Sequence, residues 1–200
     1  MVFKWDLHIP KLSPELSRRA YLYLPAGYDE QPDRRFPVMY MFDGHNVFFD
    51  EDATYGKSWG MARYLDETQT PLIVAAVECN SIGNHRLEEY CPFTCEDPKL
   101  GVIRGHGRTT MNWFVHEFKP MIDANIRTLP DRSNTFICGS SMGGLMSLYA
   151  ATAFNATFGK AACLSPSLWL GAGKMRRIIN QADIAPDTLI YLDYGGEEMA

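Results

Sequence analysis

A serine between two glycines is the first group in this sequence that could do chemistry. Residues 138–143 read C-G-S-S-M-G, which places Ser141 in the pattern G-x-S-x-G between Gly139 and Gly143. A serine hydroxyl that is held on a tight turn and activated by a neighbouring base attacks carbonyl carbons. The same five residues also fit a plain glycine-rich connection, so their meaning depends on the flanking segments.

The flanking segments favour the chemical interpretation of Ser141. Residues 135–138 predict a buried strand and residues 145–154 predict a helix, so the serine falls on the turn between them. Such a turn has a strained backbone and crowds its glycines, and the helix directs its free amides and positive dipole end at the hydroxyl. This environment would stabilise a developing oxyanion, and we therefore expect Ser141 to be a nucleophile.

The rest of the chain supplies the elements that must position this serine. At 200 residues, of which 46% are hydrophobic, it is long enough to bury a substantial core. Alternating apolar runs and helical segments predict an α/β fold with a mainly parallel sheet and helices on both faces. Because there is no internal repeat or linker, residues 1–200 predict a single domain. The expected strands are 19–24, 36–42, 71–77, 135–138, 160–164 and 188–192. The expected helices are 113–129 (bent or divided at Pro120), 145–154 and 174–181.

Charge and hydropathy exclude several classes of partner. The net charge is −5 and the basic residues are scattered, which disfavours nucleic acid. The longest apolar runs are too short to cross a bilayer, so we expect no membrane partner. The N-terminal residues lack the apolar core of a signal peptide, which favours a cytoplasmic location.

Cysteine spacing gives a weak metal signal that we do not favour. Cys91 and Cys95 form a C-x3-C pair, with His85 and His106 nearby in the sequence. This spacing beside unpaired histidines matches no strong zinc pattern. We expect the five cysteines to be reduced structural thiols, with no metal and no cofactor.

Three stretches together resemble a known family. They are YLYLPAGYDE, FPVMYMFDGHNVF and FICGSSMGGLMSLYA, and NHRLEEYCPF is similar to the family's loop after the fourth strand. In this order they resemble the putative esterases of the α/β-hydrolase fold, a group with enterochelin esterases, feruloyl esterases, S-formylglutathione hydrolases and mycolyltransferases. The resemblance spans nearly all of the chain and implies an α/β-hydrolase fold and a serine esterase that forms an acyl-enzyme at Ser141.

The resemblance also implies the partners of that serine. The family's oxyanion hole maps to the backbone amides of Met142 and His45, with Gly44 allowing the backbone to approach the acyl oxygen. The family's pattern places the triad acid three residues beyond Gly195, at Glu198. Alternatives for the acid are Asp193 and Glu197.

The histidines are the main departure from the family. All five precede Ser141, whereas the fold orders its triad as serine, acid and histidine. We therefore expect a C-terminally incomplete domain without its last strand and helix, with the catalytic histidine beyond the end of this chain and little activity on its own. The exposed edge of the last strand would favour a homo-oligomer. A dyad with His45 as the base is the alternative.

Substrate class is only broadly constrained. Aromatic residues, Trp59 and Trp113 among them, follow the strands at the edge where ligands bind, and could stack on a sugar or an aromatic acyl group or simply cover the sheet. We expect Arg86 and Glu88 to contact a polar leaving group. Acyl sugars, aromatic acyl esters, siderophores and thioesters all fit. Two other functions remain open: a non-catalytic hydrolase-like binding domain, favoured by the absent histidine, and a mycolyl-type acyltransferase, disfavoured by the lack of a secretion signal.

Overall fold

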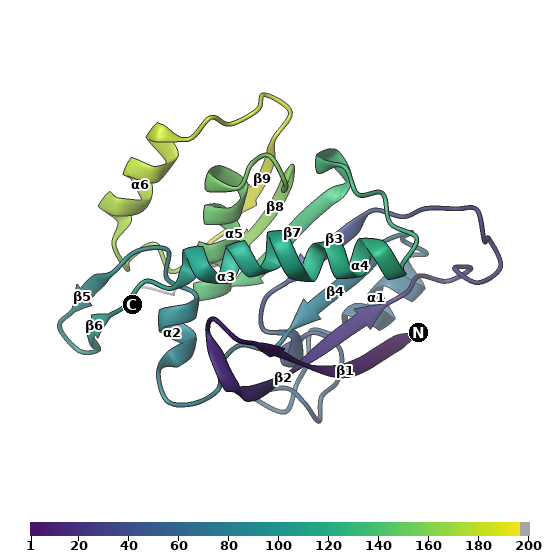
Figure 1. The fold of residues 1–200 in the computed structure, drawn as a ribbon, viewed down its shortest axis with the longest axis horizontal. Helices are drawn as coiled ribbons and strands as arrows, with labels where there is room; N and C mark the ends of the chain where they lie inside the picture. The colour runs from purple at the N-terminus through teal and green to yellow at the C-terminus, as the bar shows by residue number, and fades with distance from the viewer. Residues whose placement is uncertain (197–200) are drawn as a thin grey trace.

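The computed structural model describes residues 1–196, which are built around a seven-stranded sheet (Figure 1). Five neighbouring strands run parallel, and β1 and β2 add antiparallel pairing at one end. This confirms the expected mainly parallel sheet. In spatial order the strands are β1 (Val2–Ile9), β2 (Ser13–Tyr23), β4 (Ile73–Val77), β3 (Val38–Met41), β7 (Thr135–Ser140), β8 (Lys160–Leu164) and β9 (Leu189–Leu192).

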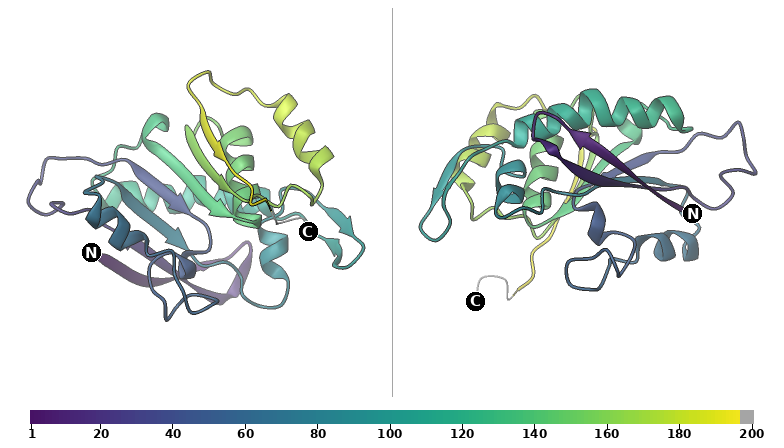
Figure 2. Two further views of the ribbon diagram at one scale, coloured as in Figure 1. Left: turned by 180° about the vertical axis from the view of Figure 1, so that it is seen from behind. Right: turned by 60° about the horizontal axis from the view of Figure 1, so that its bottom comes forward.

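Helices cover both faces of the sheet, as predicted (Figures 1 and 2). Alternate residues of β3 point to opposite faces: Tyr40 packs edge-on against Phe118, with ring centroids 5.9 Å apart, while Met41 shares a core with Leu65 of α1 on the other face. Both cores are buried, so the sheet is fixed from two sides. The helices are α1 (Met61–Glu67), α2 (His85–Glu89), α3 (Gly107–Trp113), α4 (Lys119–Asn125), α5 (Met142–Ala153) and α6 (Ala172–Gln181).

The predicted helix over residues 113–129 is wrong in its limits. Helix α3 begins earlier, a π-helical turn over Phe114–Phe118 follows it, and α4 ends at Asn125. Pro120 stands in the first turn of α4 and has no N–H to donate, so we attribute the wider π turn before it to this proline.

Several short or edge elements escaped prediction. Strand β1 mixes charged and apolar residues, and β2 begins six residues before the expected start, because its first half faces solvent. The hairpin of β5 (Cys95–Asp97) and β6 (Gly101–Ile103) is too short for a periodic signal. None of these elements carries the long apolar run that marks the central strands.

Strand β9 is exposed on both of its faces. Its four side chains, from Leu189 to Leu192, are each at least 40% exposed, although the central strand β4 is fully buried. Within residues 1–196 this strand pairs only with β8. Association along this edge stays a prediction. The helices of the described part of the chain are all too short or too polar to span a bilayer.

Candidate active site

The carboxyl ends of the parallel strands gather the residues with strained backbone. In residues 1–196 four non-glycine residues have positive φ, and three of them follow β3, β7 and β8 within two positions: Asp43 (55°), Ser141 (57°) and Ser165 (41°). Such conformations cost about 1–3 kcal/mol each and persist only where the surroundings impose them. Ligand crevices of parallel sheets form at this same edge.

Ser141 lies on the tight turn between β7 and α5. Its φ and ψ are 57° and −118°, and its N–H donates to the carbonyl of Leu164 at 2.9 Å. A β-carbon on Gly139 would come within 2.7 Å of the Gly143 carbonyl, so the turn tolerates no side chain there. The predicted strand–turn–helix order and strained backbone are confirmed. The role of Ser141 as a nucleophile stays a prediction.

The hydroxyl of Ser141 has a partner that the sequence did not suggest. Its Oγ lies 3.1 Å from Oγ of Ser167, and the backbone N–H of Ser167 donates to the carbonyl of Ser141 at 3.0 Å. Ser167 is 5% exposed, whereas Ser141 is exposed. The feature of the sequence that could have indicated this partner is a serine three residues after the end of β8. Ser167 therefore orients the Ser141 hydroxyl.

A second turn, residues 43–45, lies across from Ser141. Asp43 adopts the left-handed conformation with φ 55° and ψ 49°, and a β-carbon on Gly143 would lie 3.4 Å from its Oδ2. The 43–45 turn and the Ser141 turn are thus packed against each other. The side chain of His45 points to Thr54, with Nε2 and Oγ1 3.1 Å apart.

Gly44 is required by its close neighbours rather than by its φ. A β-carbon there would meet the backbone N and C of Val77 at 2.8 and 2.9 Å. We expect Gly44→Ala to lower the free energy of unfolding by about 1–3 kcal/mol, because backbone atoms must move to admit the methyl group. Urea unfolding measures this. Gly173→Ala on α6, where no atom lies within 4 Å, is the control and should be neutral or stabilising; equal losses would contradict the prediction.

Arg86 of α2 binds the 43–45 turn directly. Its Nε and Nη2 donate to Oδ1 and Oδ2 of Asp43, both at 2.7 Å, in a bidentate ion pair. Burial would lower the pKa of Arg86, but the hydrogen bonds and charge of Asp43 outweigh it and the pKa is raised. Asp43 is 4% exposed. The carboxylate is therefore held in one orientation.

Cysteines do not build a convincing metal site here. Asp43, His45 and Cys79 have ligand atoms within 4.8 Å of one another, but both Asp43 oxygens already accept hydrogen bonds from Arg86. Burial, and then the charge of Asp43, raise the pKa of the Cys79 thiol, which opposes the thiolate form. Elsewhere Cys91 and Cys95 are buried with sulfurs 3.9 Å apart. All five cysteines are free.

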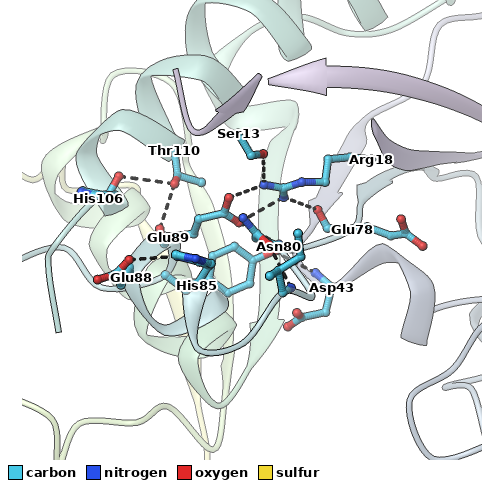
Figure 3. Close-up of polar contacts among 12 residues, drawn as sticks. Ser13, Arg18, Asp43, Glu78, Asn80, His85, Glu88, Glu89, His106 and Thr110 are labelled. Carbon is cyan, nitrogen blue, oxygen red and sulfur yellow. Dashed lines mark hydrogen bonds and ion pairs between the residues drawn. The ribbon is translucent and has the colours of Figure 1, made fainter. Parts of the chain in front are cut away.

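Helix α2 is itself anchored by a buried ion pair (Figure 3). Arg18 of β2 and Glu89 are 1% and 4% exposed and form two hydrogen bonds, one of them 3.1 Å between Nη1 and Oε2. The N–H of Asn80 also donates to Glu89 at 2.9 Å. Arg18 further donates to Oγ of Ser13 and to the carbonyl of Glu78. This network fixes α2 against the sheet.

A cavity of about 430 Å³ joins the two turns. Most of the residues that line it have polar side chains: Asp43, His45, Asn46, Thr54, Tyr55, Cys79, Asn80, Ser81, Gly83, Arg86, Ser140 and Ser141. Of the residues predicted to contact substrate, the structure brings Arg86 here but not Glu88 or the two tryptophans. Trp59 is 38% exposed and lies outside the lining.

Trp113 is a correction to the sequence prediction. It is 6% exposed and stacks on Phe118, with ring centroids 5.1 Å apart. Trp113 belongs to the last turn of α3, and its ring faces the core rather than the cavity. Helical spacing of aromatic residues marked a buried face, and we no longer assign Trp113 to substrate binding.

The predicted acid lies outside the described residues. Glu198 and its alternative Glu197 fall beyond residue 196. The other alternative, Asp193, accepts hydrogen bonds from the N–H of Ser165 at 2.8 Å and from the hydroxyl of Tyr191 at 3.2 Å. Asp193 therefore stabilises the loop after β8, and the choice of acid stays open.

The five histidines are all within the described residues. Only His45 lines the cavity, and within residues 1–196 the hydrogen-bond partner of the Ser141 hydroxyl is Ser167 rather than an imidazole. His85 pairs with Glu88 on α2 at 3.1 Å. The other three histidines are exposed: His8 lies on β1, His106 precedes α3, and His116 lies in the π-helical turn.

Comparisons with known proteins give the family of this chain and agree with its fold. The family described as "Putative esterase" matches residues 13–200. YbbA of Bacillus subtilis, described as uncharacterized, is 25% identical over 185 residues, which are 91% of this chain and 69% of that protein. Two solved structures have TM-scores of 0.73 at 19% identity: an IroE-like serine hydrolase from Shewanella oneidensis (99% of this chain, 74% of that one) and siderophore hydrolase EstA from Aspergillus nidulans (98% and 70%). At this identity the two structures show the α/β-hydrolase type of fold.

Proposed function

Because this chain belongs to the Putative esterase family, we propose that it hydrolyses small-molecule carboxylic esters through an acyl-enzyme on Ser141. One observation carries the proposal. Ser141, in a strained turn at the start of α5, shares a cavity with the strained 43–45 turn. This pairing supports a nucleophile facing an oxyanion site.

The proposed reaction has two steps. Ser141 Oγ forms a bond to the ester carbonyl carbon while its proton passes to a base, and the alcohol leaves with that proton. Water then attacks the acyl carbon, gives its proton to the base, and releases the acid as the serine regains its hydrogen. Ser167 holds the hydroxyl before the attack.

Two backbone amides stabilise the charge that develops on the carbonyl oxygen. Met142 supplies one, since the first N–H groups of a helix lack partners inside the helix and lie at its positive dipole end. His45 supplies the other through its backbone N–H. The contribution of each such donor in other hydrolases is about 10²–10³ in kcat.

The base is proposed to be a histidine outside this 200-residue sequence. Support comes from the order of the triad in this fold, where the histidine follows the acid, and from the Ser141 contacts within residues 1–196, which include no imidazole. Glu198 is the proposed acid that orients it, with Asp193 as the alternative. His45 lines the cavity and is the alternative base.

The substrate is proposed to be a polar ester. Amide and hydroxyl groups of Asn46, Thr54, Asn80 and Ser81 line the cavity, together with Arg86. These groups suit a hydroxylated or aromatic acyl ester better than a long alkyl chain. The name of one structural relative, siderophore hydrolase EstA, makes siderophore esters a natural member of a test panel.

Trapping the acyl group tests the proposal. The protein purified from its natural source is mixed with p-nitrophenyl acetate and quenched in acid. We expect one acetyl group on the peptide that contains Ser141, because acylation precedes hydrolysis. Peptide mass spectrometry locates the group. Acetyl groups on His45 or Cys79 instead, or turnover with no acyl-enzyme, would contradict the mechanism.

One observation favours a second function, a non-catalytic binding domain. The partner of Ser141 Oγ in the described residues is another hydroxyl, Ser167, which is too weakly basic to take its proton. A protein that binds an ester in the cavity without turnover would match this alternative. Binding by calorimetry alongside the acetyl-trapping experiment separates the two.

A further inference from the structure

Helix α2 and the residue after it hold the 43–45 turn at both its side chain and its backbone. Arg86 binds the Asp43 carboxylate through two hydrogen bonds of 2.7 Å, and the backbone N–H of Asp43 donates to Oη of Tyr90 at 3.2 Å. The Tyr90 ring packs on the Phe42 ring, with centroids 5.0 Å apart. The Arg86 guanidinium lies over the Tyr90 ring. Three hydrogen bonds, two from Arg86 and one to Tyr90, thus join α2 and the residue after it to Asp43.

Asp43 needs such support because its conformation is unfavourable. Aspartate, like asparagine, adopts the left-handed conformation more readily than most non-glycine residues, but still at a cost that its surroundings must offset. The two residues that follow it are Gly44, packed on the Val77 backbone, and His45, whose N–H is the proposed oxyanion donor. A small rotation at Asp43 would therefore move the His45 N–H away from the acyl oxygen.

The support is rigid because α2 is anchored behind the site (Figure 3). Glu89 lies three residues after Arg86 on the same helix and pairs with Arg18 of β2 in a buried position. The hydroxyl of Thr110 donates to the Glu89 carbonyl at 2.8 Å. The backbone of α2 therefore links the Arg18–Glu89 pair on the sheet to the Arg86–Asp43 pair at the turn.

We infer that Arg86 is a positioning residue that acts through Asp43 to hold the His45 N–H in place for the transition state. The inference rests on the proposed function for its effect on rate. Two of the three guanidinium nitrogens are occupied by Asp43, which supports this role over a direct substrate contact as the main one. The two roles predict different kinetics.

A double-mutant cycle separates positioning from substrate contact. We expect Arg86→Met and Asp43→Asn each to lower kcat about tenfold to a hundredfold with KM nearly unchanged. The reason is that a displaced oxyanion donor stabilises the transition state less while substrate binding in the ground state is unaffected. Asparagine keeps the size of aspartate and tolerates the left-handed conformation. The double variant should lose no more than the worse single one, since both remove the same contact. Multiplied losses, or a rise in KM alone, would overturn the inference.

Stability distinguishes positioning from general damage. Arg86→Met leaves the Asp43 carboxylate buried and unpaired, so this variant should be the least stable of the series. Adding Asp43→Asn removes that charge and should restore the melting temperature without restoring kcat. Arg86→Lys, which keeps the charge but not the bidentate geometry, should have an intermediate kcat. Rates that follow the melting temperature throughout would refute positioning.

Hydrogen exchange tests the same contact without turnover. In Arg86→Met we expect the amides of Asp43 and Asn46, which donate to the Tyr90 hydroxyl and the Asp43 carbonyl, to exchange about tenfold faster or more. Arg63→Met on α1, whose side chain is 78% exposed, is the control. If Ser141→Ala keeps full activity, the proposed function fails while this measurement still decides whether Arg86 holds the turn. Unchanged exchange at Asp43 and Asn46 would overturn the inference even in an active esterase.

Discussion

Changing Ser141 to alanine is expected to lower kcat for ester hydrolysis by about a million-fold, the size of the loss when the nucleophile of another serine hydrolase is removed. The substitution deletes the only atom proposed to bond to the acyl carbon. Alanine has a β-carbon like serine, so it meets the positive φ at this turn with similar strain, and the fold should persist. The rate is measured as turnover of p-nitrophenyl acetate by the protein purified from its natural source.

A matched serine tests whether the loss is specific. Ser133 precedes β7, at the opposite end of the strand from Ser141, and its exposed hydroxyl donates to Asp131. Ser133→Ala should keep full activity. Residual activity of Ser141→Ala within tenfold of the parent would place the chemistry on another residue.

Removing Arg18 is expected to lower the free energy of unfolding by about 3–5 kcal/mol, because Glu89 would be left as an unpaired buried charge. Arg18→Met keeps much of the side-chain volume while deleting the guanidinium, which is 1% exposed. Urea unfolding of the purified chain measures the change, and adding Glu89→Gln should recover part of it by neutralising the orphaned carboxylate.

The neighbouring arginine provides the control. Arg19 points to the other face of β2, its side chain is 43% exposed, and its ion pairs with Asp6 and Asp52 are 3.8 and 3.6 Å long. Long ion pairs made by an exposed arginine contribute about 0–1 kcal/mol, so Arg19→Met should change stability little. A loss at Arg18 no larger than the loss at Arg19 would mean that the buried pair does not anchor α2.

The sequence predicted the central strands and the Ser141 turn because both leave local signatures. Buried parallel strands such as β4 are continuous apolar runs, and a crowded strand-to-helix turn requires glycines at fixed positions. Spacing alone therefore located Ser141 on its turn and indicated that its backbone would be strained. These inferences need no knowledge of which segments meet in space.

Contacts between distant segments were out of reach for the same reason. Arg86 and Asp43 are 43 residues apart, and Arg18 and Glu89 are 71 apart, so no local pattern joins them. Helix α2 is only five residues long and shows no periodicity. Trp113 was misread because an aromatic residue after a strand suggests a ligand site, whereas its helical neighbours Phe114 and Phe118 indicated a buried face.

The backbone strain at the sheet edge has a consequence for laboratory evolution. Glycine at position 141 or 165 would relieve the cost of a positive φ, about 1–3 kcal/mol, which is larger than the entropic cost of about 0.5–1 kcal/mol that glycine adds. A library of variants sorted only for survival on heating should accumulate glycine at these positions, whereas sorting for turnover should deplete it at Ser141. Positions at which the two selections give different glycine frequencies would identify residues whose strained backbone lowers stability but is needed for turnover.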